Sequence, residues 1–115
     1  MYKVLHLSPM IPSFNIRETR DFFVDFFGFE LLMDGDYSIV KKDAHLVHIL
    51  QAGDDIGEME FYLEVDGVDD LWDSIRDRLP VTKLRPPFDR EYGMREFHIV
   101  VPHTKTLMFV GQVIQ

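Results

Sequence analysis

Cysteine is absent from the sequence, and this absence excludes both a disulfide framework and a thiolate zinc site. No stretch approaches the roughly 18 consecutive apolar residues that a membrane-spanning helix requires. The first residues contain a single lysine and a short apolar stretch that prolines interrupt, without an A-x-A-like cleavage site, so they do not resemble a signal peptide. Together these absences favour a cytoplasmic protein.

Positive charge is scarce, because 12 Lys and Arg residues stand against 20 Asp and Glu residues and leave a formal net charge of −8. Nucleic-acid binding relies on Lys and Arg to neutralise phosphates, so we expect no nucleic-acid partner. The acidic balance suits a cationic small ligand through electrostatic steering. The same charge serves solubility alone in many proteins, and that interpretation stays open.

Motifs of covalent catalysis and of nucleotide binding are also missing. The sequence has no G-x-S-x-G elbow and no cysteine nucleophile, and neither G-x-G-x-x-G nor G-x-x-x-x-G-K-[ST] occurs. The chain is instead rich in apolar residues, with 46% hydrophobic residues and ten Phe in 115 positions. One domain of this length buries about two thirds of its unfolded surface, so we expect a single folded domain.

The clearest local pattern predicts a helix from Asn15 to Gly28. Asn15 is a good N-cap, and Glu18, three residues later, completes a pair that resembles a capping box. Gly28 stands where a left-handed residue ends a helix. The apolar face of this helix, which recurs at helical spacing, consists of Phe22, Phe23, Phe26 and Phe27. A face of this kind predicts a sheet beneath it.

Short strands are predicted around this helix in the first half of the chain. Residues 3–9 are β-prone and open a strand that continues through Phe14, and the two prolines within it predict an edge or chain-swapped position. The runs after the helix are Phe29–Met33, Tyr37–Lys41 and Ala44–Leu50. The polar connection of residues 52–57 is the best candidate for a module boundary.

The second half repeats this order at an offset of 52 residues, the distance from Ile16 to Val68. It contains a strand over Met59–Val65, a helix over Val68–Leu79 that Pro80 ends, a weak strand over Val81–Leu84 and a loop through Pro86, Pro87 and Asp89. Two strands follow, Met94–Val101 and Thr106–Val110. The sequence therefore predicts an α+β fold of two βαβββ modules, about residues 1–55 and 56–115, in one pseudo-symmetric domain of residues 1–115.

Several motifs resemble the vicinal oxygen chelate superfamily of glyoxalases, extradiol dioxygenases and bleomycin resistance proteins. Pro9–Phe29 is similar to the family's opening P-V-L-P-V-x-D…FY…LGF, and Leu63–Leu71 is similar to its V-D-D-V-D-x-L turn. Tyr92–Phe97, with Pro102 and Phe109–Gln112, is similar to the W-G-M-R-E-F…D-P-D-G-N…F-G-Q pattern of the bleomycin-resistance-like branch. The resemblance implies a curved mixed sheet around a cleft, and a homodimer.

The resemblance also implies where a metal would be bound in members that use one. By motif the ligand positions fall on Ser8, His48, Glu60 and Met108. Serine is a poor ligand and a thioether is soft, so only two donors suit a divalent ion. We therefore expect no metal and no other cofactor; the alternative is a divalent metal at His48 and Glu60.

We interpret the chain as a small-molecule binding protein that encloses its ligand without catalysis. The alternatives are a metal-dependent lyase or dioxygenase of the same fold, and a module that binds only other proteins. His48 and Glu60 form either a pair that orients a ligand or a core histidine and a solvated carboxylate. Arg95 and Glu96 form either a cleft-edge pair or a surface pair, and Trp72 is expected in the core. The predicted ligand-binding residues are Met10, Phe14, Tyr37, His48, Glu60, Tyr62, His98 and Met108.

Overall fold

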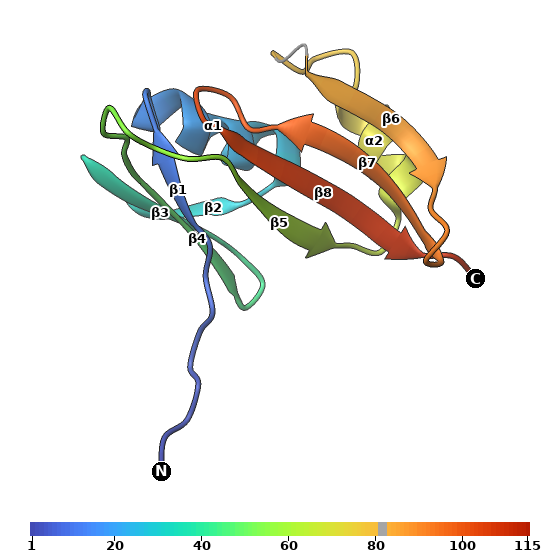
Figure 1. Cartoon of the computed structure of the whole chain (residues 1–115), viewed down its shortest axis with the longest axis horizontal. Helices are drawn as coiled ribbons and strands as arrows, with labels where there is room; N and C mark the ends of the chain where they lie inside the picture. The colour runs from blue at the N-terminus through green and yellow to red at the C-terminus, as the bar shows by residue number, and fades with distance from the viewer. Residues whose placement is uncertain (81–82) are drawn as a thin grey trace. The chain divides into compact units, whose positions relative to one another are not determined.

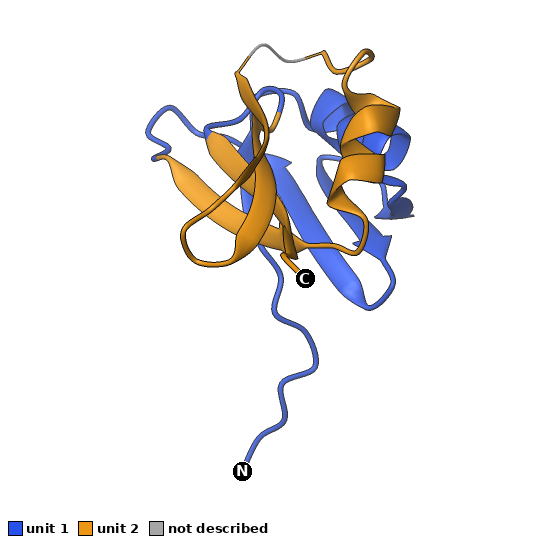
Figure 2. Cartoon of the chain, turned by 90° about the vertical axis from the view of Figure 1, so that its right-hand side faces the viewer, with its two compact units in different colours: residues 1–57, 102–105 blue, residues 58–101, 106–115 orange. Residues whose placement is uncertain are grey.

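The structure, a computed structural model, describes residues 1–80 and 83–115. The chain forms two compact units, which Figure 2 colours separately. Unit 1 comprises residues 1–57 and 102–105, and unit 2 comprises residues 58–101 and 106–115. None of the helices in the described residues has the length and the apolar character that crossing a membrane would require.

Unit 1 is a four-stranded sheet with one helix against it (Figure 1). The strand order is β1-β4-β3-β2, in which β1 runs parallel to β4 and the other neighbours are antiparallel. Its elements are β1 (Met10–Ser13), α1 (Ile16–Phe27), β2 (Glu30–Met33), β3 (Tyr37–Lys42) and β4 (His45–Gln51). The segment of residues 102–105 joins this unit because Thr19 Oγ1 donates a hydrogen bond to the Pro102 carbonyl at 2.8 Å.

Helix α1 confirms the helix that was expected between Asn15 and Gly28. The Asn15 Oδ1 atom accepts a hydrogen bond from the Glu18 backbone N–H at 3.2 Å, and Gly28 ends the helix with a left-handed φ of 71°. Phe22, Phe23 and Phe27 are buried. Burial of each ring stabilises the fold by about 1.5–3 kcal/mol, so this face anchors α1 to the sheet.

The predicted strand over residues 3–9 is wrong, because strand β1 covers only Met10–Ser13. Toward the N-terminus, the pairing of β1 with β4 extends to Pro9, whose carbonyl accepts a hydrogen bond from the His48 N–H at 3.0 Å. Residues 1–9 form an extended arm that leads away from β1 in Figure 1. Its apolar side chains lie in solvent, and Leu7 is 93% exposed. A strand requires a neighbour to pair with, and no described segment of this chain pairs with residues 1–8.

Unit 2 repeats the topology of unit 1. Its strand order is β5-β8-β7-β6, in which β5 runs parallel to β8 and the other neighbours are antiparallel. The elements are β5 (Met59–Glu64), α2 (Val68–Ile75), β6 (Leu84–Asp89), β7 (Met94–Val100) and β8 (Thr106–Val113). The predicted α+β class and the repeated βαβββ order are therefore confirmed.

Helix α2 ends at Ile75, four residues before the predicted end at Leu79. After Ile75 the backbone tightens, because the Arg78 N–H donates to the Ile75 carbonyl at 2.9 Å, a bond from residue i+3 to residue i. The Ser74 hydroxyl also donates to the Leu71 carbonyl at 2.7 Å. Side chains that compete for backbone carbonyls in this way shorten a helix. Residues 81–82 of the predicted weak strand lie outside the described residues.

Strand β6 includes Pro86 and Pro87, where a loop was expected. The strand is at the edge of its sheet, and its register with β7 shifts between Arg85 and Phe88. Proline cannot donate a ladder hydrogen bond, so it is tolerated in an edge strand where such an irregularity removes it from the ladder. The loop prediction is wrong for this reason.

The N-terminus of α2 is capped from a distant strand. The Gln112 Oε1 atom of β8 accepts hydrogen bonds from the backbone N–H groups of Gly67 and Val68, at 3.1 and 2.8 Å. On the apolar side of the helix, the Trp72 ring packs on Phe97 of β7 with centroids 5.1 Å apart. Trp72 therefore contributes to the packing of helix on sheet, as expected.

Candidate functional site

The face of the unit 2 sheet opposite α2 carries most of its polar and aromatic side chains. Side chains alternate along a strand. Because Phe97 of β7 points to α2, its neighbours Glu96 and His98 point to the other side. We call this side the open face of unit 2.

The strand register aligns aromatic rings across this open face. His98 of β7 lies opposite Phe109 of β8, which in turn lies opposite Tyr62 of β5. The ring centroids of His98 and Phe109 are 4.1 Å apart, and those of Phe109 and Tyr62 are 6.2 Å apart at an interplanar angle of 27°. Phe88 of β6 lies 5.2 Å from His98. These residues, one from each strand of the sheet, form the aromatic row.

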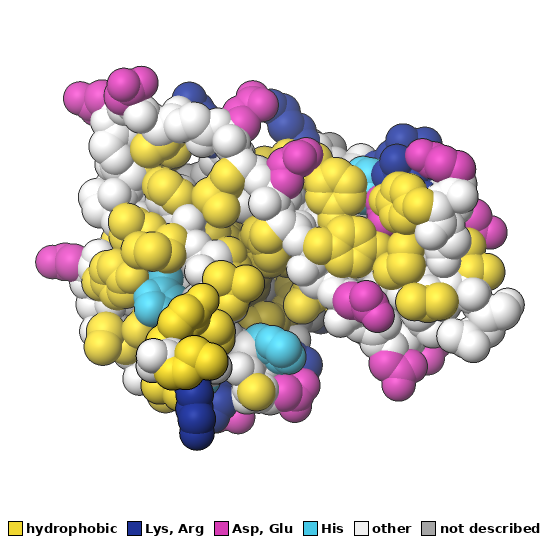
Figure 3. Space-filling view, turned by 60° about the horizontal axis from the view of Figure 1, so that its bottom comes forward, with side chains coloured by type: hydrophobic (Ala, Val, Ile, Leu, Met, Phe, Trp, Pro, Cys, Tyr) yellow, Lys and Arg dark blue, Asp and Glu magenta, His cyan; other side chains and the backbone are white. Residues whose placement is uncertain are grey.

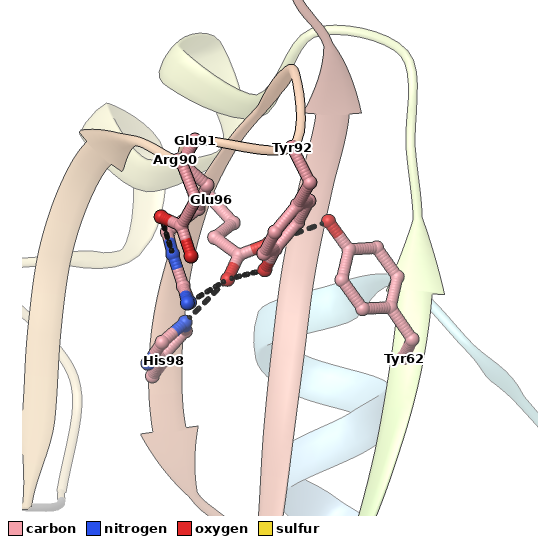
Figure 4. Close-up of polar contacts among 6 residues, drawn as sticks. All are labelled: Tyr62, Arg90, Glu91, Tyr92, Glu96 and His98. Carbon is pink, nitrogen blue, oxygen red and sulfur yellow. Dashed lines mark hydrogen bonds and ion pairs between the residues drawn. The ribbon is translucent and has the colours of Figure 1, made fainter.

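Beside the row, one buried carboxylate collects hydrogen bonds from several elements (Figure 4). Glu96 is 0% exposed. Its Oε2 atom accepts from the Tyr62 hydroxyl at 2.7 Å. Its Oε1 atom accepts from the Tyr92 hydroxyl at 2.5 Å and from Arg90 Nη1 at 2.7 Å, and it lies 2.7 Å from His98 Nε2. We call these residues the Glu96 cluster.

The cluster holds Glu96 in its ionised form. Burial by itself raises the pKa of this carboxyl, but the hydrogen bonds from Tyr92, His98, Tyr62 and Arg90 outweigh burial and lower the pKa from 4.5 to about 2. Burial and the hydrogen bond to Glu96 raise the pKa values of both tyrosines. A carboxylate only accepts hydrogen bonds, so the hydroxyls and the His98 Nε2–H all donate to it at neutral pH.

Gly111 of β8 makes the contact between Tyr62 and Glu96 possible. Gly111 lies opposite Glu96 on one side and Glu64 on the other. A Cβ at this position would lie 1.9 Å from the Tyr62 hydroxyl oxygen and 3.1 Å from Glu96 Cβ. Figure 4 shows the Tyr62 hydroxyl pointing across β8 to Glu96. The path is open only because residue 111 has no side chain.

An open depression of about 370 Å³ adjoins this arrangement in unit 2. It is lined by Glu60, Phe61, Tyr62, Tyr92 and Phe109. The lining is therefore aromatic, with the Glu60 carboxylate and two tyrosines as its polar members. Figure 3 presents a surface on which hydrophobic side chains (yellow) are exposed over wide areas with acidic side chains (magenta) around them. Such a lining suits a ligand with an aromatic group.

Unit 1 presents a different open face, on the side of its sheet opposite α1. His48 of β4 lies opposite Met10 of β1 and Ile39 of β3. The Tyr37 hydroxyl and His48 Nδ1 are 2.8 Å apart, and their rings meet edge to face with centroids 5.7 Å apart. Phe14, which follows β1, is 54% exposed. Lys41 of β3 lies on the same face, opposite Glu30 of β2, so this face combines apolar side chains with exposed polar ones.

Six of the eight predicted site residues lie on these two faces. Their distribution is as follows: Glu60, Tyr62 and His98 lie on the open face of unit 2; Met10, Tyr37 and His48 lie on that of unit 1; and Phe14 follows β1. Met108 departs from the expectation, because it is 0% exposed and points to the side of β8 that α2 covers. Its neighbour Phe109 takes the position that the prediction gave to Met108.

The predicted metal-ligand positions are distributed over both units. Ser8 lies in the arm, His48 bonds Tyr37 within unit 1, Glu60 lies in unit 2, and the Met108 thioether is buried. Over residues 1–80 and 83–115, neither unit contains three or more His, Asp or Glu side chains grouped to hold a metal ion.

Glu96 is the main residue that sequence reasoning misjudged. Arg95 and Glu96 were expected to pair with each other, but they point to opposite faces of β7. Arg95 donates instead to Asp69 at 3.0 Å and to Asp89 at 3.1 Å. The usable signal was the alternation in β7, which places Glu96 and His98 on one face with Phe97 on the other.

Comparison with known proteins identifies the fold. The sequence matches no protein-family model and has no match among curated proteins. The bleomycin-binding protein of Streptomyces verticillus, solved with copper(II)-bleomycin, superimposes with a TM-score of 0.74 at 21% identity and covers 100% of this chain and 99% of its own. The antibiotic-binding protein TnmS3 from Streptomyces sp. CB03234 gives 0.76 at 20% identity, with 98% and 97% covered.

A third solved structure belongs to a glyoxalase-related enzyme from Clostridium phytofermentans, with a TM-score of 0.78, 17% identity and 98% of each chain covered. The chain has the glyoxalase/bleomycin resistance fold. The resemblance to the vicinal oxygen chelate superfamily is thus confirmed at the level of the fold. Because this fold includes both binding proteins and an enzyme, function must be argued from the site.

Proposed function

We propose that this protein binds a small molecule with an aromatic group, without catalysis, and that the depression on the open face of unit 2 receives it. The aromatic row beside the depression is the observation that carries this proposal, because each ring offers a large apolar contact at low entropic cost. Glu60 adds a carboxylate that meets a cationic group. The neighbours that bind bleomycin and another antibiotic support this proposal.

A direct test measures binding of bleomycin, with and without copper(II), by isothermal titration calorimetry. We expect Phe109→Ala to weaken binding at least about tenfold, because it removes the central ring of the row. Phe14→Ala, which removes an exposed aromatic side chain of unit 1, is the matched control. Weakening by Phe14→Ala alone would move the site to unit 1.

Bleomycin need not be the natural ligand, so a thermal-shift screen extends the test. The compounds are glycopeptide antibiotics, aromatic catabolites and thiol conjugates. A ligand that binds only the folded protein stabilises it by RT ln(1 + [L]/Kd), so the melting temperature rises with ligand concentration. Uniformly flat results would favour the remaining alternative, a module that binds only other proteins.

The alternative of a metal-dependent lyase or dioxygenase is tested separately. Elemental analysis of protein purified without chelator measures the metal content directly. A near-stoichiometric divalent metal that is lost in His48→Ala would overturn the non-catalytic proposal.

We also propose a cytoplasmic homodimer, in which the arm of residues 1–9 contacts a second copy. The arm exposes several apolar side chains, with Leu5 at 81% and Leu7 at 93% exposure, and covering them removes apolar surface from water. Light scattering of the purified protein should give the mass of two chains. Leu5→Ser with Leu7→Ser should shift the protein toward the mass of one chain; a monomer mass for the unmodified protein would refute the dimer.

A further inference from the structure

The Glu96 cluster fixes the direction of every hydrogen bond within it. An ionised carboxylate has no proton to give, so the hydroxyl hydrogens of Tyr62 and Tyr92 both point to Glu96. The Nε2 hydrogen of His98 points there as well. Each phenol oxygen retains the capacity to accept a further hydrogen bond. These hydroxyls are therefore available to a ligand as acceptors and not as donors.

Glu60, the third polar residue that lines the depression, also acts only as a hydrogen-bond acceptor. Glu60 is exposed on β5 and lines the depression with both tyrosines, and its carboxylate only accepts. The Arg90 guanidinium, which could donate, bonds Glu96 and Glu91 and lies over the Tyr92 ring at 4.7 Å. The Arg85 guanidinium lies 3.6 Å from the Phe88 ring centroid, on β6 at the far edge of the sheet from β5. Neither arginine lines the depression.

The hydroxyl of Tyr62 is held in place on a side chain that is only partly buried. It lies where a Cβ of residue 111 would stand, and Tyr62 is 41% exposed and Tyr92 51% exposed. The protein thus presents two oriented oxygen acceptors beside an aromatic wall.

We infer that Glu96 is a specificity-determining residue, which makes the depression select aromatic ligands that carry N–H or O–H donors over ligands of the same shape that carry none. This inference rests on the proposed function and names the chemical class of its ligand. Glu96 acts through Tyr62 and Tyr92, so it is a positioning residue and touches no ligand itself. A ligand without donors covers these oxygens and removes their water without replacing the hydrogen bonds that water made, and this loss weakens its binding.

The test uses two neutral probes of the same shape. Indole carries one N–H donor, and benzofuran has an oxygen in its place. Binding to the full-length ¹⁵N-labelled protein is followed by NMR shifts of the Tyr62 and Phe109 amides. We expect indole to bind at least about fivefold more tightly than benzofuran, the size expected for one hydrogen bond.

Two variants separate the effect of hydrogen-bond direction from the effect of removing a negative charge. Glu96→Gln introduces an amide that donates as well as accepts, so the preference for indole should fall below about twofold as one hydroxyl reverses. Glu64→Gln removes an equal charge from an exposed position on the same face of β5 and should keep the full preference. Equal binding of both probes by the unmodified protein, or a preference that survives Glu96→Gln, would overturn the inference and leave the proposed function standing.

A second readout does not depend on any ligand. Spectrophotometric titration of the tyrosines reports whether the hydroxyls donate to a carboxylate, because such hydrogen bonds delay their ionisation. Glu96→Gln should bring the ionisation of Tyr62 and Tyr92 to lower pH, and Glu64→Gln should leave most of the delay. A titration that Glu96→Gln does not change would refute the hydroxyl orientation, whereas failure of both probes to bind would refute the proposed site and the inference with it.

Discussion

Unit 1 and unit 2 arrange their strands in the same order but place polar groups in different positions. On the open face of unit 1, Tyr37 and His48 form an exposed hydrogen bond. On the open face of unit 2, a buried carboxylate bonds two hydroxyls, a guanidinium and an imidazole. A repeated topology therefore does not repeat its chemistry. The open face of unit 2 surrounds a buried carboxylate with hydrogen-bond donors, and the open face of unit 1 does not.

The largest effect that separates the units is expected from Glu96→Ala. Removal of a buried carboxylate leaves Arg90 Nη1 and the other groups that donate to Glu96 without this acceptor, which costs about 3–5 kcal/mol of unfolding free energy. Urea denaturation followed by circular dichroism measures this loss. Glu64→Ala, at an exposed position on the same face, should change stability by no more than about 0.5 kcal/mol. Equal losses in the two variants would contradict a structural role for the cluster.

Low pH should destabilise the folded protein by protonating the same carboxylate. Hydrogen bonding lowers the pKa of Glu96 from 4.5 to about 2 in the folded protein. The stabilisation from its ionisation is therefore complete above about pH 4.5 and is lost as the pH falls toward 2. Glu96→Gln should flatten this part of the stability profile, as measured by thermal melts across the range. A profile that keeps its full slope would assign acid sensitivity to other carboxylates.

Gly111→Ala is expected to have the next largest effect. The added methyl would overlap the Tyr62 hydroxyl and displace it from Glu96, at a cost of about 1–3 kcal/mol for overpacking. Gly53→Ala is a matched control, because a Cβ there meets nothing within 4 Å. A structure of the variant, or its tyrosine titration, shows whether Tyr62 has moved. Comparable stability of the two variants would show that Tyr62 relaxes without cost.

The two helix caps offer a smaller contrast. Asn15→Ala and Gln112→Ala each remove side-chain acceptors at a helix N-terminus, and each should cost about 0.5–2 kcal/mol. Hydrogen exchange should locate the losses, in the first turn of α1 for Asn15→Ala and at Gly67 and Val68 for Gln112→Ala. Unchanged exchange at those amides would mean that water replaces the cap.

The smallest effect is expected from Tyr37→Phe in unit 1. Its hydrogen bond to His48 is exposed, so water replaces the lost partner and stability should change by at most about 0.5 kcal/mol. Tyr62→Phe in unit 2 removes a bond to an ionised, buried acceptor and should cost about 1.5–3 kcal/mol. Chemical denaturation compares the two variants. A larger loss of stability for Tyr37→Phe than for Tyr62→Phe would contradict the contrast between the units.

Features set by neighbouring residues were predictable from the sequence. The cap at Asn15, the Phe face and the stop at Gly28 all belong to one short segment, and α1 forms as expected. The alternation in β5 was equally local. Residues 3–9 had strand propensity too, but a strand also needs a partner, which propensity does not supply.

The contact between Tyr62 and Glu96 required information that no local pattern contains. The two residues lie 34 positions apart in the sequence, and the register of β5, β8 and β7 brings them together. The position of Met108 depended on the same register, because a shift of one residue exchanges the two faces of a strand. Most strands could thus be predicted from the sequence, apart from residues 3–9 and β6, whereas the face of each side chain depended on pairing.

The cap on α2 bears on the order in which the chain acquires structure. Helix α1 carries its own cap three residues before the amide that it serves. Helix α2 depends on Gln112, which follows Val68 by 44 residues. During synthesis α1 can therefore form as soon as its residues emerge, but α2 lacks its capping group until β8 has been made. We expect α1 to form early, residues 102–105 to complete unit 1 only after most of unit 2 has been translated, and the last strand to complete the second helix.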